Sequence, residues 1–293
     1  QTGCGMMDCK KALTESNGDF DKAVEYLREK GLAAAAKKAG RIAAEGMVFA
    51  EADMAKKVGV VIEVNAETDF VAKNELFRTF VQDLAQIVIN ENPADVDALL
   101  KCKMGDGDVD AALKEKILVI GENIKIRRFE RFEGVCAAYV HGGGTHGVLV
   151  EFNTSDAVAA KPEFVAFGKD IAMQIAAVNP AYLNEASVPA EVLEKEKEIL
   201  LAQISNDPKL ASKPDQVKEK MVEGKIGKYY KENCLVDQQF VKDGDLTVAQ
   251  YVEKTGKELG GDIEIVKYVR FEKGEGLEKK EDDFAAEVAS MVK

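Results

Sequence analysis

The chain has 293 residues, of which 46% are hydrophobic and 31% are charged, a balance typical of folded globular proteins. Its formal net charge of −12 argues against direct nucleic-acid binding, because contacts with phosphates require a basic surface. The sequence contains no run of about 18 apolar residues, so it predicts no membrane-spanning helix. It opens with no charged-then-apolar leader, so we expect a cytoplasmic protein.

Residues 1–40 are predicted to form a small helical module followed by a linker. Apolar spacing predicts one helix over 6–15 and another over 21–30, with an Asn-Gly turn between them. Gly31 is expected to end the second helix. The alanine-rich segment 32–40 is interpreted as a helical linker, because alanine is the strongest helix former.

Residues 41–133 are predicted to form an α+β subdomain. Alternating β-branched residues indicate a hairpin, and Phe77, Val81, Leu84 and Val88 recur at helical spacing on one face. The expected elements, in chain order, are a hairpin within 46–66, helices at 70–90 and 108–120, and a strand at 124–132.

The same pattern then repeats. Segment 59–65 (GVVIEVN) matches 147–153 (GVLVEFN), and the closing Arg-Phe-Glu at 131–133 matches 270–272. After a one-residue slip the helices also match, at Phe77, Phe80, Asp83 and Ala85 against Phe164, Phe167, Asp170 and Ala172. We therefore predict an α+β fold with a duplicated core of two subdomains with antiparallel sheets, the second formed by 134–179 and 231–273.

Two further segments are expected outside the repeat. Segment 180–230 holds four of the six prolines and two apolar stripes, which predicts an inserted antiparallel helical hairpin. Segment 274–293 is predicted to be a C-terminal helical module. Its helix at 282–292 carries Phe284, Val288 and Met291 on one face.

Residues present in only one copy of the repeat are the better candidates for function. Segment 67–70 (ETDF) of the first copy stands opposite 155–158 (SDAV) in the second, so Asp69 and Phe70 have no counterpart. Two interpretations are open. Either Thr68 or Asp69 caps the helix and Phe70 belongs to the core, or Phe70 is an aromatic side chain directed at a partner.

The sequence offers little for enzyme chemistry. Its two histidines, His141 and His146, flank a glycine-rich turn that a strand follows, so the turn is a hairpin rather than a phosphate loop. The five cysteines lack CxxC spacing, and no common catalytic motif is present. We expect no enzyme, no metal site and no bound cofactor. A hydrolase using the two histidines, and an assembly or chaperone-like binding module, remain alternatives.

Five motifs in order resemble the translation elongation factor Ts family across nearly the whole chain. They are TGCGMMDCKKAL at 2–13, TDFVAKN at 68–74, IGENI at 120–124 with Arg127 and Arg128, the His141-Gly142 pair, and DFAAEV at 283–288. The resemblance implies a non-enzymatic guanine-nucleotide exchange factor for elongation factor Tu in translation elongation. It also implies a ubiquitin-associated-like N-terminal module whose first helix would precede residue 1.

The resemblance also implies which residues bind Tu. Asp69 and Phe70 would wedge into the GTPase domain and disturb the magnesium and phosphate site, and no cofactor of the chain's own is implied. A homodimer within a 2:2 complex is left open, as is whether the hairpin contacts Tu or a second copy. The implied partner-binding residues are Met6, Met7, Asp69, Phe70, Val71, Ile120, Gly121, His141 and Phe284.

Overall fold

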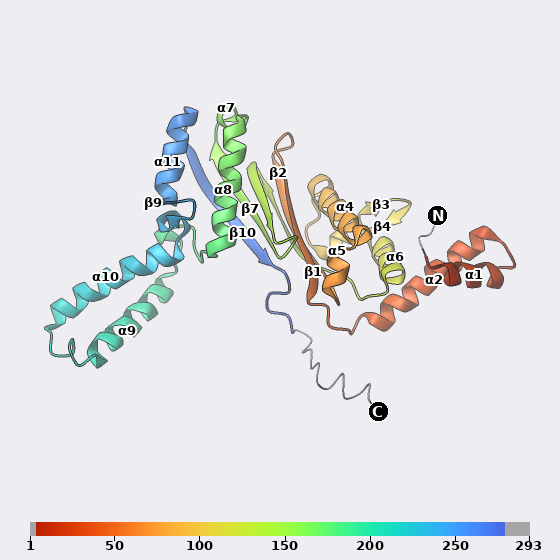
Figure 1. Ribbon diagram of the computed structural model, residues 1–293, viewed down its shortest axis with the longest axis horizontal. Helices are drawn as coiled ribbons and strands as arrows, with labels where there is room; N and C mark the ends of the chain where they lie inside the picture. Colours follow the sequence, from red (N-terminus) through yellow and green to blue (C-terminus); the bar gives the residue numbers. More distant parts are fainter. Residues whose placement is uncertain (1–3, 279–293) are drawn as a thin grey trace.

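Figure 1 shows the architecture of the computed structural model, in which residues 4–278 are described. Two three-stranded antiparallel sheets lie in the centre, and helices cover the outer face of each. One helix pair extends from the N-terminal side, and another extends from the opposite side of the molecule (Figure 1). The chain is thus a mixed α+β protein with antiparallel sheets, as the sequence predicts. The division into five domains remains a prediction.

The N-terminal helix pair differs from the prediction at Gly31. Helix α1 spans Met6–Glu15, but α2 spans Phe20–Lys38 without a stop. A Cβ atom on Gly31 would lie 3.6 Å from the Lys114 carbonyl oxygen of helix α6 (Val109–Ile120). Gly31 is therefore an interior residue of α2 where this helix packs on α6, not a helix end, and the alanines after it continue the helix.

The first α+β unit corrects the predicted helix at 70–90. Helix α3 ends at Ala72, and the Asn74 side chain accepts a hydrogen bond from the Leu76 amide to begin a separate helix, α4. Asn at this position starts helices well because it satisfies a free amide. The elements are β1 (Glu45–Asp53), β2 (Val58–Ala66), α3 (Asp69–Ala72), α4 (Glu75–Glu91), α5 (Val96–Leu99), β3 (Lys103–Met104), β4 (Gly107–Asp108), α6 and β5 (Lys125–Glu133).

The second unit repeats this order with the same strand pairing. The first sheet has the order β1-β2-β5, and the second has β10-β7-β6. The elements are β6 (Val135–His141), β7 (His146–Thr154), α7 (Asp156–Ala159), α8 (Pro162–Val178), η1 (Glu185–Ser187), α9 (Ala190–Asn206), α10 (Asp215–Asn233), η2 (Leu235–Asp237), β8 (Gln239–Phe240), β9 (Asp243–Thr247), α11 (Val248–Leu259) and β10 (Ile263–Glu272).

The two sheets pack face to face, so their central strands are buried on both sides. On β2, Val60 packs beneath the helices, whereas Val61 packs between the sheets. The contacts are reciprocal, since Gly59 lies against Leu149 and its counterpart Gly147 lies against Val61. A Cβ atom on Gly59 would lie 2.4 Å from Leu149 Cδ1, so this approach requires glycine.

Helices α9 and α10 lie where the sequence predicts a helical hairpin. They pack on one another through a small apolar cluster that is separate from the clusters of the two sheets. In Figure 1 the pair projects away from the sheets. The buried members of this cluster are Leu200, Ile204, Val222 and Ile226.

The predicted helix at 282–292, with Phe284, Val288 and Met291, lies outside the described residues. Within residues 4–278, no helix is both long and apolar enough to cross a membrane.

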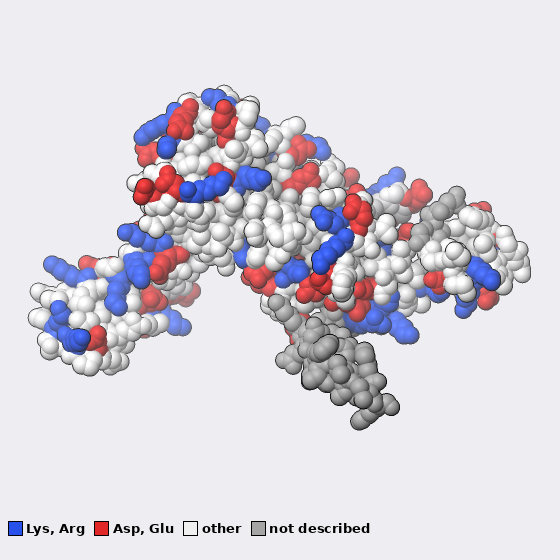
Figure 2. All heavy atoms as spheres, viewed as in Figure 1, with Lys and Arg blue, Asp and Glu red and all other residues white. Residues whose placement is uncertain are grey.

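Figure 2 shows acidic and basic side chains interspersed on the face in view.

Candidate functional site

Phe70 is the most conspicuous candidate, because its aromatic side chain lies largely in solvent. It is 76% exposed on the single-turn helix α3, directly after the central strand β2. The interpretation of Phe70 as a core residue is therefore wrong. The break at Asn74 rotates α3 out of the helical phase of α4, so the spacing between Phe70 and Phe77 no longer places them on one face.

Val71, the next residue, corrects another prediction. It is only 6% exposed and packs into the core of the first unit. Its side chain is thus unavailable to a partner and instead anchors α3. The adjacent Asp69 is exposed and pairs with Lys73 at 2.9 Å, and this hydrogen bond lowers the pKa of Asp69. The Lys73 ammonium lies 5.7 Å from the centre of the Phe70 ring.

The start of α3 is held by the carboxylate of Glu122, which follows α6. Glu122 Oε2 accepts hydrogen bonds from the backbone amides of Glu67 and Thr68, each at 3.0 Å. The Thr68 hydroxyl donates to Glu122 Oε1 at 2.6 Å. We call these three hydrogen bonds the Glu122 clasp. Thr68 makes no side-chain cap on α3, contrary to one of the two interpretations of the sequence.

A second set of contacts links the same two loops to the loop after α2. The Asn123 amide donates to Glu67 Oε1 at 2.7 Å, and Arg41 Nη1 lies 3.4 Å from the same oxygen. The Asn123 side chain donates to the Arg41 carbonyl at 2.8 Å. The loops that follow α2, β2 and α6 are therefore tied together beneath α3. Sequence reasoning did not identify Glu67, Glu122, Asn123 or Arg41 as members of this site.

The second copy shows what is particular to the first. Helix α7 begins one residue sooner after its strand than α3 does, so Asp69 corresponds to Asp156 and Phe70 to Ala157. The prediction that Asp69 has no counterpart is wrong, because the one-residue slip lies in the loop before the short helix. Within α3, Phe70 is the residue whose counterpart in α7, Ala157, is much smaller. Glu67 lies in the loop that is one residue longer in the first copy.

Ile120 and Gly121 lie beside this site at the end of α6. Gly121 adopts φ 88° and ends the helix, as the sequence predicts, which directs Glu122 back toward Thr68. Ile120 is half-buried against the core of the first unit. The structure thus brings the predicted residues Asp69, Phe70, Ile120 and Gly121 into one region.

His141 lies in the β6–β7 turn, at the end of the sheets where β1 begins. The Val48 amide of β1 donates to the Gly144 carbonyl of this turn at 2.8 Å. His141 is exposed, and its Nδ1 lies 3.0 Å from the Tyr139 hydroxyl. Nowhere in residues 4–278 do three or more His, Cys, Asp or Glu side chains gather as metal ligands would.

Met6 and Met7 are separate from these residues. They are 86% and 73% exposed on α1, which packs on α2 at the far end of the molecule (Figure 1). The structure does not bring them next to Phe70. The remaining candidate, Phe284, lies outside the described residues.

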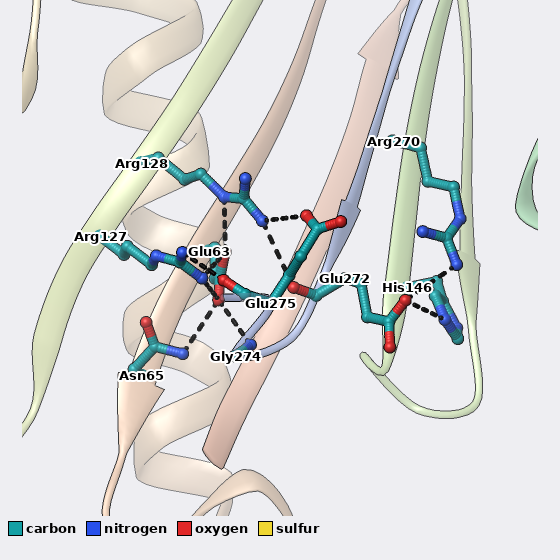
Figure 3. A network of polar contacts seen from close by, with 9 residues as sticks. All are labelled: Glu63, Asn65, Arg127, Arg128, His146, Arg270, Glu272, Gly274 and Glu275. Atoms are coloured by element: carbon teal, nitrogen blue, oxygen red, sulfur yellow. Dashed lines mark hydrogen bonds and ion pairs between the residues drawn. The ribbon is translucent and has the colours of Figure 1, made fainter. Parts of the chain in front are cut away.

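A buried polar network joins the first sheet to the segment after β10 (Figure 3). Its centre is Glu63 on β2, which is fully buried and accepts hydrogen bonds from the Gly274 amide and from Asn65. Arg127 and Arg128 on β5 lie 3.0 and 2.6 Å from its carboxylate oxygens. Burial alone would raise the pKa of Glu63, but these hydrogen bonds outweigh it and lower the pKa.

The comparisons with known proteins agree on one family. A family model described as elongation factor TS matches residues 67–275. A Clostridium perfringens elongation factor Ts is 54% identical, over 99% of this chain and 95% of its own length. Those of Symbiobacterium thermophilum and Syntrophotalea carbinolica are 50% and 49% identical, over 98% and 100% of this chain and 93% and 96% of their own lengths.

These matches define a protein of the translation elongation machinery. The chain belongs to the elongation factor Ts family.

Proposed function

We propose that this chain is a guanine-nucleotide exchange factor for elongation factor Tu, acting in the cytoplasm as a binding protein and not as an enzyme. Family membership supports the class of function. The observation that carries the mechanism is the exposed ring of Phe70 on a short helix that is held at its start by Glu122 and by the buried side chain of Val71. Buried aromatic side chains often dominate the binding energy of a protein interface, and a free ring held in place is suited to that role.

The proposed mechanism requires no covalent step. Phe70, with Asp69 beside it, enters the GTPase domain of Tu and displaces side chains that order the magnesium ion. Since magnesium bridges phosphate oxygens of the nucleotide, loosening it speeds the release of GDP. Magnesium and GDP belong to the partner, and the chain supplies no cofactor of its own.

Other residues extend the proposed contact. Ile120 and Gly121 end the helix that precedes the Glu122 clasp, and His141 ends β6, which contacts β1 as α3 does. We include all three among the proposed contacts. Met6 and Met7 present exposed thioether side chains at a second, distant point of contact. Phe284 is retained as a proposed contact on the family resemblance alone.

The test replaces Phe70 and a matched control. We expect Phe70→Ala to slow the release of a fluorescent GDP analogue from purified Tu by about tenfold or more, since a dominant interface side chain contributes about 2 kcal/mol or more. The control is Phe20→Ala, which removes another exposed phenylalanine, 55% exposed on α2. Thermal unfolding establishes that both variants are folded. Wild-type release rates in folded Phe70→Ala would remove Phe70 from the mechanism.

A further inference from the structure

We infer that Glu122 is a positioning residue for Phe70. In this account, the Glu122 clasp fixes the start of α3 so that the Phe70 ring points outward and is presented to the partner. The inference rests on the proposed function, in which Phe70 makes the decisive contact. It adds a residue whose side chain need not touch the partner.

Helix α3 is too short to be stable without contacts to the rest of the chain. It contains only four residues, and a single helical turn fixes many dihedral angles for few hydrogen bonds. Thr68 supplies no side-chain cap. Three contacts hold α3 in place: Val71 is buried in the core, Asp69 pairs with Lys73 across the turn, and the Glu122 clasp binds its start. Of these, the clasp is the one that binds the backbone amides just before α3.

Both oxygens of the Glu122 carboxylate bind this loop. Oxygen Oε2 accepts hydrogen bonds from two backbone amides, and Oε1 accepts one from the Thr68 hydroxyl. Hydrogen bonds to a charged acceptor are stronger than neutral ones. Arg41, which lies 3.4 Å from Glu67, supplies positive charge beside the two neighbouring carboxylates. The clasp is therefore a specific arrangement of partners and not a chance surface contact.

The second copy has no carboxylate at the position of Glu122. Helices α6 and α11 have equal length and end on glycine, so Gly261 stands in the place of Glu122. A Cβ atom on Gly261 would lie 2.7 Å from Val158 Cγ2, so α7 packs directly on the backbone there. The Ser155 hydroxyl accepts a hydrogen bond from the Val158 amide at 3.3 Å and so caps α7. The copy without the carboxylate is thus also the copy without the aromatic ring.

The test is a double-mutant cycle on the full chain, read as GDP release from Tu over a range of factor concentrations. We expect Glu122→Ala to lower the maximal release rate by about tenfold, the equivalent of one charged hydrogen bond. In a Phe70→Ala background the same change should cost less than about twofold, because residues that act through one another are not additive. The matched control is Glu253→Ala, which removes a carboxylate from α11 in the second copy.

A conservative variant and a local readout separate positioning from general damage. Glu122→Gln keeps an oxygen for the two amides and offers an NH₂ group to Thr68, so it should retain most of the release rate. In Glu122→Ala, hydrogen exchange should quicken at the Glu67 and Thr68 amides but not in β2 or α4. A structural defect would quicken exchange in all of these segments.

The outcomes distinguish this inference from the proposed function. If Phe70→Ala slows release but Glu122→Ala does not, or if the two losses multiply, the positioning role is wrong and the exchange function stands. Equal losses in Glu122→Gln and Glu122→Ala, or loss of protection throughout β2 and α4, would also overturn it. If Phe70→Ala itself has no effect, the proposed mechanism fails and the inference fails with it.

Discussion

Glu63 is the buried centre of the contact between the first sheet and the segment after β10, to which Arg127, Arg128 and Glu45 also contribute. Its fully buried carboxylate accepts hydrogen bonds from Asn65, Arg127, Arg128 and the Gly274 amide (Figure 3). A buried charge is tolerated only when its partners are this complete, and removing one partner costs far more than removing an exposed pair. Arg128 also stacks on the ring of Phe271, 4.1 Å from its centre, which joins the two sheets at the same place.

Because the folded-state pKa of Glu63 is lowered, its contribution to stability is present above its ordinary value of 4.5 and is lost as the pH falls through the folded-state pKa. We expect Glu63→Gln to lower the free energy of unfolding by about 1–3 kcal/mol at neutral pH. The difference from wild type should shrink as the pH falls below 4.5. Urea unfolding measured across this range checks it.

The control for this prediction is Glu133→Gln, which removes a carboxylate that pairs with Arg131 but is itself mostly exposed. It should change stability little at any pH. A Glu63→Gln difference that stays constant from neutral to acidic pH would show that folding does not lower the pKa of Glu63.

Single residues also show where sequence reasoning stopped. The motif around Phe70 marked the position, but apolar spacing could not decide between core and surface, because it cannot show that Asn74 divides the helix. Glu122 was visible only as a neighbour of Gly121. Its hydrogen bonds to Thr68 join residues 54 positions apart in the sequence. Such long-range polar contacts leave no periodic signal.

At the scale of elements, the sequence predicted type and order well and boundaries less well. The strands of the two main sheets, α1 and α6 were predictable because alternation and helical spacing are strong there. The short strands β3, β4, β8 and β9 were not predicted. The repeat was predictable because both copies bury the same pattern of side chains. The end of α2 was not predictable. Glycine often ends a helix, but here α2 packs on α6 and continues through Gly31.

The α9–α10 hairpin has its own apolar cluster, so it should unfold locally. We expect Ile204→Ala, which removes a fully buried side chain, to destabilise the hairpin by about 2–5 kcal/mol. Hydrogen exchange should quicken in α9 and α10 and stay unchanged in β2 and β7. The control is Leu201→Ala on the exposed side of α9. Equal loss of protection in β2 and β7 would instead mean that hairpin and sheets unfold as one unit.

At the scale of the whole molecule, two copies of one unit pack reciprocally. The second copy contains the inserted α9–α10 hairpin, and the first contains the Glu122 clasp and Phe70. Arg128 lies over Phe271, and the equivalent Lys267 lies over Phe132 at 4.2 Å, so the sheet contact repeats in both directions. The Glu122 clasp and Phe70 occur only in the first copy. The shared contacts therefore hold the two units together, and the features found only in the first copy mark the proposed contact with Tu.

The exchange proposal also has a whole-molecule consequence. If binding of this chain weakens the affinity of Tu for GDP by some factor, GDP must weaken the affinity of Tu for this chain by the same factor. New nucleotide then displaces the chain, which becomes free to act on another Tu molecule. Catalytic exchange, and not a stable complex, is the expected behaviour.

The most direct measurement is the release of a fluorescent GDP analogue from purified Tu, at fixed magnesium concentration and with unlabelled GDP in excess, when this chain is present well below the molar amount of Tu. We predict complete and accelerated release, because each molecule of the chain acts on many Tu molecules in turn. Release that is not accelerated, or that stops once each molecule of the chain has acted on one Tu, would contradict the account.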